Sequence, residues 1–205
     1  MIKSIAGRRL DPLLHRLFPF LFVWRLNPNA LTVIGVLVSL GAAVAFADGR
    51  PRLAAGLVLF GGFFDLVDGV IARHQGTSSR FGAFLDATLD RLSDMALLLG
   101  ISVHAAALAD PGGVALAGAV LCASVLVSYS KARAELVVPG FSAGFMERGE
   151  RVAALAAGAL LGLLTPALWL ILVGSSITVA QRFALAYREM ERMDRAEKDA
   201  VETLG

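Results

Sequence analysis

The chain has 205 residues, of which 57% are apolar, and its mean hydropathy is +0.70. This apolar share exceeds the ~45–50% of soluble domains, and it indicates an all-α integral membrane protein with several spans. The net charge of +2 gives no sign of a nucleic-acid partner, and the single cysteine excludes an internal disulfide.

Residues 1–27 carry apolar side chains at helical spacing, interrupted by charged residues and Pro19. A cleavable signal peptide is therefore not expected. We expect an amphipathic juxtamembrane helix that lies on the membrane surface, with a short helix docked on the protein itself as the alternative. A membrane domain is expected over residues 28–187, followed by a charged cytoplasmic tail over residues 188–205.

Six apolar segments are separated by Gly, Pro and polar residues, and each is long enough to be a transmembrane helix. Lys and Arg gather on the side of the segments that holds both termini, whereas the opposite side has only Arg50 and Arg52. The positive-inside rule then places both termini on the cytoplasmic side of the cell membrane. Gly158 and Gly162 form a GxxxG pair that fits helix packing within one subunit or between two. The six predicted segments are 29–47, 53–73, 82–106, 111–131, 148–164 and 167–187.

Four aspartates stand in two pairs within the second and third segments. Asp65 and Asp68 are three residues apart, and Asp86 and Asp90 are four apart, so each pair shares one helix face. The two helices run antiparallel, and Asp65 and Asp90 each lie eight residues from the connecting loop, about 12 Å along the helix. The four carboxylates are therefore predicted to meet at one depth.

A cluster of this kind needs positive charge, because an isolated charge within a bilayer costs roughly 3 kcal/mol. Oxygen donors without His or Cys suit Mg²⁺ or Mn²⁺, and four carboxylates balance two divalent ions. In the alternative interpretation, the aspartates form a structural network with Arg73, Arg80 and Arg91. Asp94 continues the same spacing, and we expect it to orient a ligand or to pair with an arginine.

A second group of charged residues is basic and comes from three separate segments. If these cations converge, they would bind a phosphate group, with arginine offering two parallel hydrogen bonds. The pattern favours an acceptor that is itself phosphorylated, and ordinary anchoring at the membrane surface is the alternative. The group consists of Lys131, Arg133, Arg148, Arg151 and Arg182.

The aspartate pairs belong to a longer motif, D-x2-D-G-x2-A-R-x8-G-x3-D-x3-D. Eight residues match it at fixed spacing, and by them the chain is identified as a member of the CDP-alcohol phosphotransferase family. The resemblance implies six transmembrane helices, a homodimer, and transfer of a phosphatidyl-type group from a CDP-linked donor to an alcohol, with release of CMP. The matching residues are Asp65, Asp68, Gly69, Ala72, Arg73, Gly82, Asp86 and Asp90.

The family resemblance also implies roles for individual residues. Asp65, Asp68, Asp86 and Asp90 would hold the metal, and Asp90 would also be the general base on the acceptor hydroxyl. The donor CDP-diacylglycerol would be held near its nucleotide by residues of the first segment and of the hairpin. These residues are Asn29, Ala30, Leu31, Thr32, Gly69, Arg73 and Ser79.

The blocks SYSKARAE, GFMERGER and VAQRF resemble the phosphatidylinositol phosphate synthase branch of that family, although Asn29 stands where this branch would have Asp. The branch implies that Lys131, Arg151 and Arg182 hold the phosphate of inositol 1-phosphate, with Arg133 and Arg148 as further candidates. Related alternatives are a phosphatidylglycerophosphate synthase and an archaetidylinositol phosphate synthase. A divalent-cation transporter is the alternative from another class, although its ligands should be spread across the bilayer.

Overall fold

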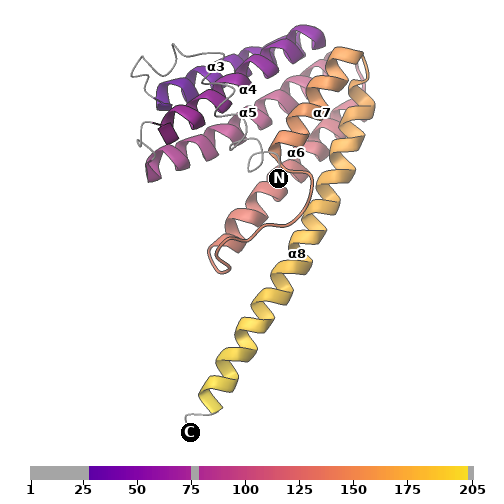
Figure 1. Cartoon of the computed structure of the whole chain (residues 1–205). Coiled ribbons are helices and arrows are strands. Elements are labelled where there is room, and N and C mark those ends of the chain that lie inside the picture. Colours follow the sequence, from indigo (N-terminus) through magenta and orange to yellow (C-terminus); the bar gives the residue numbers. More distant parts are fainter. Residues whose placement is uncertain (1–27, 75–78, 203–205) are drawn as a thin grey trace.

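The computed structural model describes residues 28–74 and 79–202 (Figure 1). The amphipathic helix expected over residues 1–27 lies outside the described residues, as do residues 75–78 and 203–205. Side chains at positions 28, 66, 68–70, 72–74 and 200–202 are not described either. The described part of the chain is all-α, as predicted. Its helices are α3 (Pro28–Ala47), α4 (Pro51–His74), α5 (Arg80–Ala107), α6 (Pro111–Glu135), α7 (Arg148–Leu161) and α8 (Leu164–Glu202).

Each predicted segment corresponds to one of these helices, and local capping explains several of the boundaries. The Ser79 hydroxyl accepts a hydrogen bond from the Gly82 N–H at 2.9 Å, which caps the start of α5. Asp110 caps α6 in the same way through Gly113, and Pro111 occupies the first helical position, where no N–H is needed.

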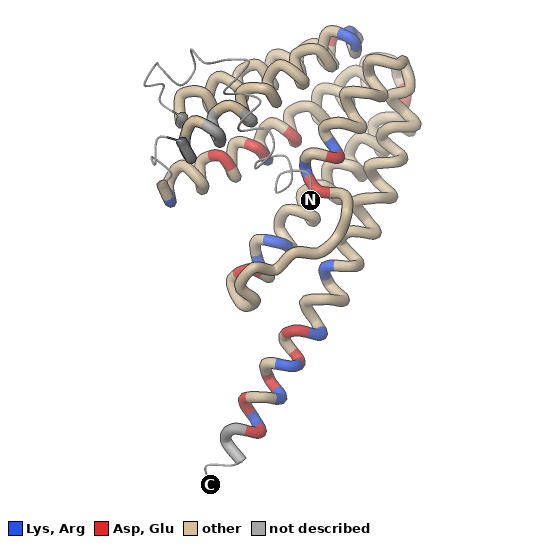
Figure 2. The backbone as a smooth tube through the Cα atoms, viewed as in Figure 1, with Lys and Arg blue, Asp and Glu red and all other residues tan. Residues whose placement is uncertain are grey.

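The break between α7 and α8 differs from the prediction at Thr165-Pro166. Helix α7 ends at Leu161, and Gly162 follows with φ of 73°, the left-handed conformation that glycine adopts without strain. Helix α8 then begins at Leu164, so Pro166 lies in its first turn, which tolerates proline. Helix α8 continues through the charged segment to Glu202 (Figure 2).

The helices pack in a ring around a common interior. Helix α3 contacts α4 and α5, α5 contacts α6, and α6 contacts α8. Helix α8 contacts α7, and α7 returns to α4, which closes the ring (Figure 1). All six helices can therefore contribute side chains to one central site.

Small residues allow the helices to approach closely, as is common where packing rather than hydrophobicity drives association in a bilayer. Ala42, Ala54 and Ala159 are fully buried in the core. A Cβ atom at Gly100 of α5 would overlap the backbone of Ala43 in α3. A Cβ atom at Gly158 of α7 would overlap Ala167 of α8, so this glycine of the GxxxG pair serves packing within the subunit.

Among the described residues, three helical stretches are long and apolar enough to cross a membrane: Asn29–Ala47, Pro111–Glu135 and Leu164–Asp199. Helix α5 carries several charged residues along its length, and α7 has only 14 residues.

Candidate active site

Three carboxylates from two antiparallel helices form the centre of the site. Asp65 of α4 and Asp86 and Asp90 of α5 each place one carboxylate oxygen within 4.8 Å of the others. Asp90 is buried, with 8% of its surface exposed. The backbone of Asp68 lies one turn beyond Asp65 on α4, and its side chain is not among those described. The prediction that the aspartates of the two helices meet is therefore confirmed for Asp65, Asp86 and Asp90.

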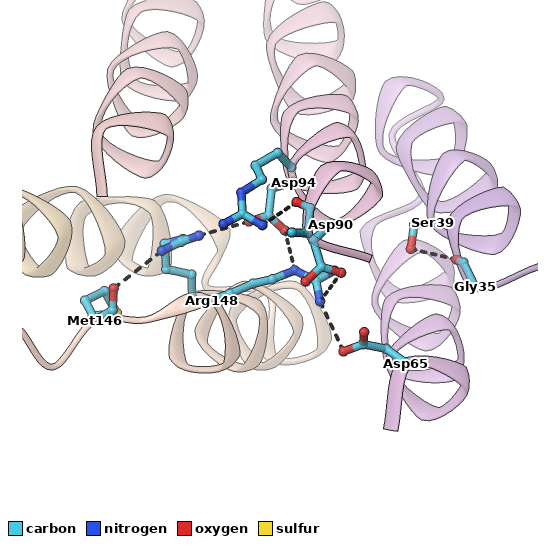
Figure 3. Close-up of polar contacts among 10 residues, drawn as sticks. Gly35, Ser39, Asp65, Asp90, Asp94, Met146 and Arg148 are labelled. Carbon is cyan, nitrogen blue, oxygen red and sulfur yellow. Dashed lines mark hydrogen bonds and ion pairs between the residues drawn. The ribbon is translucent and has the colours of Figure 1, made fainter. Parts of the chain in front are cut away.

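Arg148, the first residue of α7, reaches into this carboxylate cluster. Its Nη1 atom lies 2.8 Å from Asp90 Oδ1 and 3.2 Å from Asp65 Oδ2 (Figure 3). Its Nε atom donates to Asp94 Oδ1 at 3.3 Å. One guanidinium group on α7 thus contacts three carboxylates from α4 and α5.

Asp94 connects the cluster to a second arginine. Its Oδ2 atom lies 3.0 Å from Arg151 Nη2, while its Oδ1 atom accepts from Arg148. Arg151 is 5% exposed and also donates to the carbonyl oxygen of Met146. Asp94 therefore pairs with arginine, which was one of the two roles expected for it. Its partners are Arg148 and Arg151, whereas Arg91 donates to the carbonyl oxygen of Ala87.

The segment between α6 and α7 passes beside α8, where Arg182 and Thr178 hold it. Arg182 is 2% exposed and donates to the carbonyl oxygens of Ala143 and Val127. The Thr178 hydroxyl accepts from the Met146 N–H at 3.0 Å. These bonds fix the residues immediately before Arg148, so α8 helps to position the start of α7.

Glu147 lies between the remaining basic side chains. Its Oε1 atom is 4.0 Å from Lys131 Nζ and 3.9 Å from Arg182 Nη2. Lys131 is half-buried, whereas Arg133 is exposed, because two residues correspond to about 200° around a helix. Four of the five predicted basic residues therefore contact an acidic side chain of the site, and Arg133 is exposed.

A cavity of about 670 Å³ joins these groups, and residues from all six described helices line it. Asp65, Asp86 and Asp90 line it together with Lys131, Arg148 and Arg182. Apolar side chains line another part of it, including Val36, Val58, Leu59, Phe63 and Leu97. The cavity thus combines carboxylates, cations and an apolar wall.

Most of the residues expected near the nucleotide lie at the starts of α3 and α5. A Cβ atom at Gly82 would lie 3.1 Å from Ser79 Oγ and 3.3 Å from Asn29 Oδ1. The side chains of Ser79 and Asn29 therefore both lie against Gly82. Thr32 lines the cavity, Leu31 is buried and Ala30 is exposed. The surroundings of Gly69 and of the Arg73 side chain are not described.

Two contacts in the site were not expected from the sequence. Glu147 was not a candidate, and Arg148 was expected only as a ligand of the acceptor phosphate. The sequence contains one signal that points to both, since the run Glu147-Arg148-Gly149-Glu150-Arg151 alternates charges at the start of a helix. The contact partner of Arg148 could not be inferred, because Asp65 is 83 residues away.

The three carboxylates of the cluster fit a hard divalent cation. They offer oxygen donors alone, their oxygens are within reach of one ion, and the cavity gives room for further oxygen ligands from a bound phosphate. A divalent ion at this position would bridge anionic oxygens that otherwise repel one another.

The helical fold, the carboxylate cluster and the adjoining cavity define a membrane enzyme that acts on an anionic substrate. The family model for CDP-alcohol phosphatidyltransferases matches residues 25–188, and the chain belongs to this family.

Relatives and solved structures agree with this assignment. The chain is 36% identical over 192 residues to the archaetidylinositol phosphate synthase of Pyrococcus horikoshii, covering 93% of this chain and 99% of the relative. It is also 36% identical to the phosphatidylinositol phosphate synthase of Streptomyces avermitilis, covering 96% of this chain and 86% of the relative.

Two solved structures match as well. The crystal structure of the Mycobacterium tuberculosis phosphatidylinositol phosphate synthase with CDP-DAG bound has a TM-score of 0.73 and 33% identity, covering 88% of this chain and 93% of that one. The same enzyme in complex with manganese and citrate matches with a TM-score of 0.74, 33% identity, and 88% of each chain covered.

Proposed function

We propose that this enzyme transfers the phosphatidyl group of CDP-diacylglycerol to inositol 1-phosphate, forming phosphatidylinositol phosphate and CMP. The observation that carries the proposal is the single cavity that joins Asp65, Asp86 and Asp90 to Lys131 and Arg182. The carboxylates suit a metal-bound pyrophosphate, and the basic side chains suit a second phosphate.

Asp65, Asp86 and Asp90 would hold Mg²⁺ or Mn²⁺, and Asp68 is the fourth candidate ligand. One or two such ions, when bound, neutralise the donor pyrophosphate and the charge that develops as CMP leaves. The manganese reported for the M. tuberculosis synthase supports this choice of ion. Asn29, Ala30, Leu31, Thr32, Gly69, Arg73 and Ser79 are the proposed contacts of CDP-diacylglycerol.

In the proposed reaction, an acceptor hydroxyl attacks the phosphorus atom that carries the diacylglycerol. A bond forms between the acceptor oxygen and this phosphorus, and the bond to the CMP oxygen breaks. Asp90 accepts the proton of the attacking hydroxyl, a role that its buried position beside the cavity allows. Holding both substrates in one cavity removes the need for a covalent intermediate on the enzyme.

Lys131, Arg151 and Arg182 are the proposed residues for the acceptor phosphate. Lys131 and Arg182 line the cavity, and Arg151 forms an ion pair with Asp94, which lines the cavity. Arg182 already donates to two backbone carbonyls, so its Nη2 atom, 3.9 Å from Glu147, is the part best placed to turn toward a phosphate. Arg133 is the weakest candidate because its side chain is exposed.

For the enzyme in its membrane, we propose that all six described helices span the bilayer and that the active site faces the cytoplasm. The basic residues at the site end of the molecule support this orientation, because such residues favour the cytoplasmic side. We also propose that the enzyme is a homodimer, in line with the family resemblance.

An acceptor panel tests the proposed function directly. Purified enzyme with Mn²⁺ or Mg²⁺ and CDP-diacylglycerol labelled in its lipid is offered inositol 1-phosphate, inositol or glycerol 3-phosphate in parallel. We expect labelled phosphatidylinositol phosphate and CMP with inositol 1-phosphate alone. Turnover only with glycerol 3-phosphate would overturn the proposed acceptor, and cation flux in liposomes without release of CMP would indicate a transporter.

A further inference from the structure

Arg148 and a divalent cation would use the same carboxylates. Arg148 Nη1 lies between Asp90 Oδ1 and Asp65 Oδ2, at 2.8 Å and 3.2 Å. These two aspartates, with Asp86, are the residues whose oxygens come within 4.8 Å of one another. A positively charged guanidinium and a divalent cation repel each other strongly in a poorly hydrated site. The two cations therefore compete for Asp65 and Asp90.

The contacts of Arg148 are divided between two ends of its guanidinium group. Nη1 contacts the aspartates of the cluster, whereas Nε is bonded to Asp94 on the other side (Figure 3). Asp94 is itself fixed by Arg151 at 3.0 Å. Asp94 therefore gives Arg148 a partner outside the cluster of Asp65, Asp86 and Asp90, which can keep the side chain in the site when Nη1 leaves Asp65 and Asp90.

The contacts at the site favour such an exchange over simple addition of an ion. Arg148 contacts Asp65, Asp90 and Asp94, and Arg151 contacts Asp94. A divalent ion carries twice the charge of a guanidinium group and is therefore attracted more strongly to the same carboxylates. The Nη1 end of Arg148, once displaced, remains beside the cavity that it lines. The displaced group is then available to an anionic substrate.

We propose that Arg148 is a built-in counter-cation of the carboxylate cluster, which a divalent ion displaces from Asp65 and Asp90 while Asp94 retains it. The inference rests on the proposed metal site, and it adds that Arg148 and the ion compete. Arg148 thereby acts as a positioning residue: it offsets part of the negative charge of the cluster before the ion binds, and it moves one cation toward the substrate afterwards.

The test is Mn²⁺ affinity without substrates, measured on intact enzyme in detergent by the paramagnetic resonance of free Mn²⁺. Arg148→Gln removes the competing charge, so Mn²⁺ should bind roughly tenfold tighter, within the range for charges in one ion-pair network. Arg148→Lys retains a competing charge and should stay near the affinity of the unmodified enzyme. Arg52→Gln, an exposed change at the opposite end of α4, should leave the affinity unchanged.

A second readout is the melting temperature with and without Mn²⁺. The increase caused by Mn²⁺ should be larger in Arg148→Gln than in the unmodified enzyme, since the variant lacks the counter-charge when no ion is present. Equal or weaker Mn²⁺ binding by a folded Arg148→Gln variant would overturn the competition. Failure of the unmodified enzyme to bind Mn²⁺ would overturn the proposed metal site itself, so the two failures are distinguishable.

Discussion

At the scale of single residues, Asp90 combines more contacts than its place in the motif indicates. It belongs to the carboxylate cluster, it is the proposed base, and it lies 2.8 Å from Arg148. Its depth in the membrane follows from its spacing to Asp86 and to the loop, which the sequence contains. Its arginine partner follows from the packing of α7 against α4, which local sequence does not encode.

Asp90→Asn is expected to abolish turnover, because the amide cannot accept the hydroxyl proton and is a weaker metal ligand. The substitution keeps the shape of the side chain, so the enzyme should stay folded and should retain much of its affinity for CDP-diacylglycerol. Release of CMP and equilibrium binding of the labelled donor, measured on the same preparation, check both parts. Full activity would remove Asp90 as the base.

Arg182→Gln tests whether a buried arginine supports both stability and acceptor binding. The change leaves the carbonyl oxygens of Val127 and Ala143 without their charged donor, and each buried acceptor so affected costs about 1–3 kcal/mol. We expect a lower melting temperature and a higher KM for inositol 1-phosphate, with the KM for CDP-diacylglycerol less affected. Arg192→Gln, on the exposed part of α8, is the matched control and should change stability by no more than about 0.5 kcal/mol. An unchanged melting temperature and KM in Arg182→Gln would contradict both roles.

At the scale of elements, the contact between α3 and α5 sets where the aspartates of α5 lie. Gly100 faces the backbone of Ala43 directly, and a backbone atom cannot move aside as a flexible side chain would. The two helices are therefore held at one separation by the lack of a side chain at this position, three turns from Asp90.

Gly100→Ala should destabilise the protein by about 1–3 kcal/mol, the usual range for overpacking in a dense core. Gly56→Ala is the matched control, since a Cβ atom there meets nothing within 4 Å and alanine favours helix. Melting temperatures of both variants in one detergent measure the difference. A stable Gly100→Ala variant would mean that α3 and α5 separate without cost.

The positions of the helices could be predicted from apolar runs and from breaks at Gly, Pro and polar residues, because both signals are local. Thr165-Pro166 was misinterpreted as a break, since proline fits the first turn of a helix as well as a loop. The motif also predicted the meeting of Asp65, Asp86 and Asp90. The partners of Arg148, Arg151 and Glu147 could not be predicted, because each depends on helices that meet only in the folded ring.

At the scale of the whole molecule, charge is distributed unevenly along the direction of the helices. Arg50 and Arg52 lie at the connection between α3 and α4, and the charged part of α8 extends away from the other helices, as Figure 2 shows. Cys122 is the only cysteine of the chain. Its replacement provides a background in which one newly introduced cysteine shows on which side of the membrane that position lies.

In a Cys122→Ser background, R192C and R52C should react with a membrane-impermeant maleimide from opposite sides of sealed vesicles. We expect R192C to be labelled in inside-out vesicles and R52C in right-side-out vesicles, because the basic end is the one proposed to face the cytoplasm. Labelling of both positions from one side would contradict the proposed spans, and labelling in the reverse order would contradict only the orientation. Detergent-solubilised samples, in which both positions should react, serve as the control.

The closure of the helix ring also has a consequence for how the protein folds. Helices α3, α4 and α5 follow one another along the chain and can pair early, whereas α7 must return to α4 from the far part of the chain. Contacts between distant residues form slowly, since they carry the largest loss of chain entropy before any gain. The Arg148–Asp65 contact joins residues 83 positions apart and belongs to this late step. The carboxylates of the active site therefore acquire their contact with Arg148 only when the ring closes, and a chain stalled before closure would hold its helices without a finished active site.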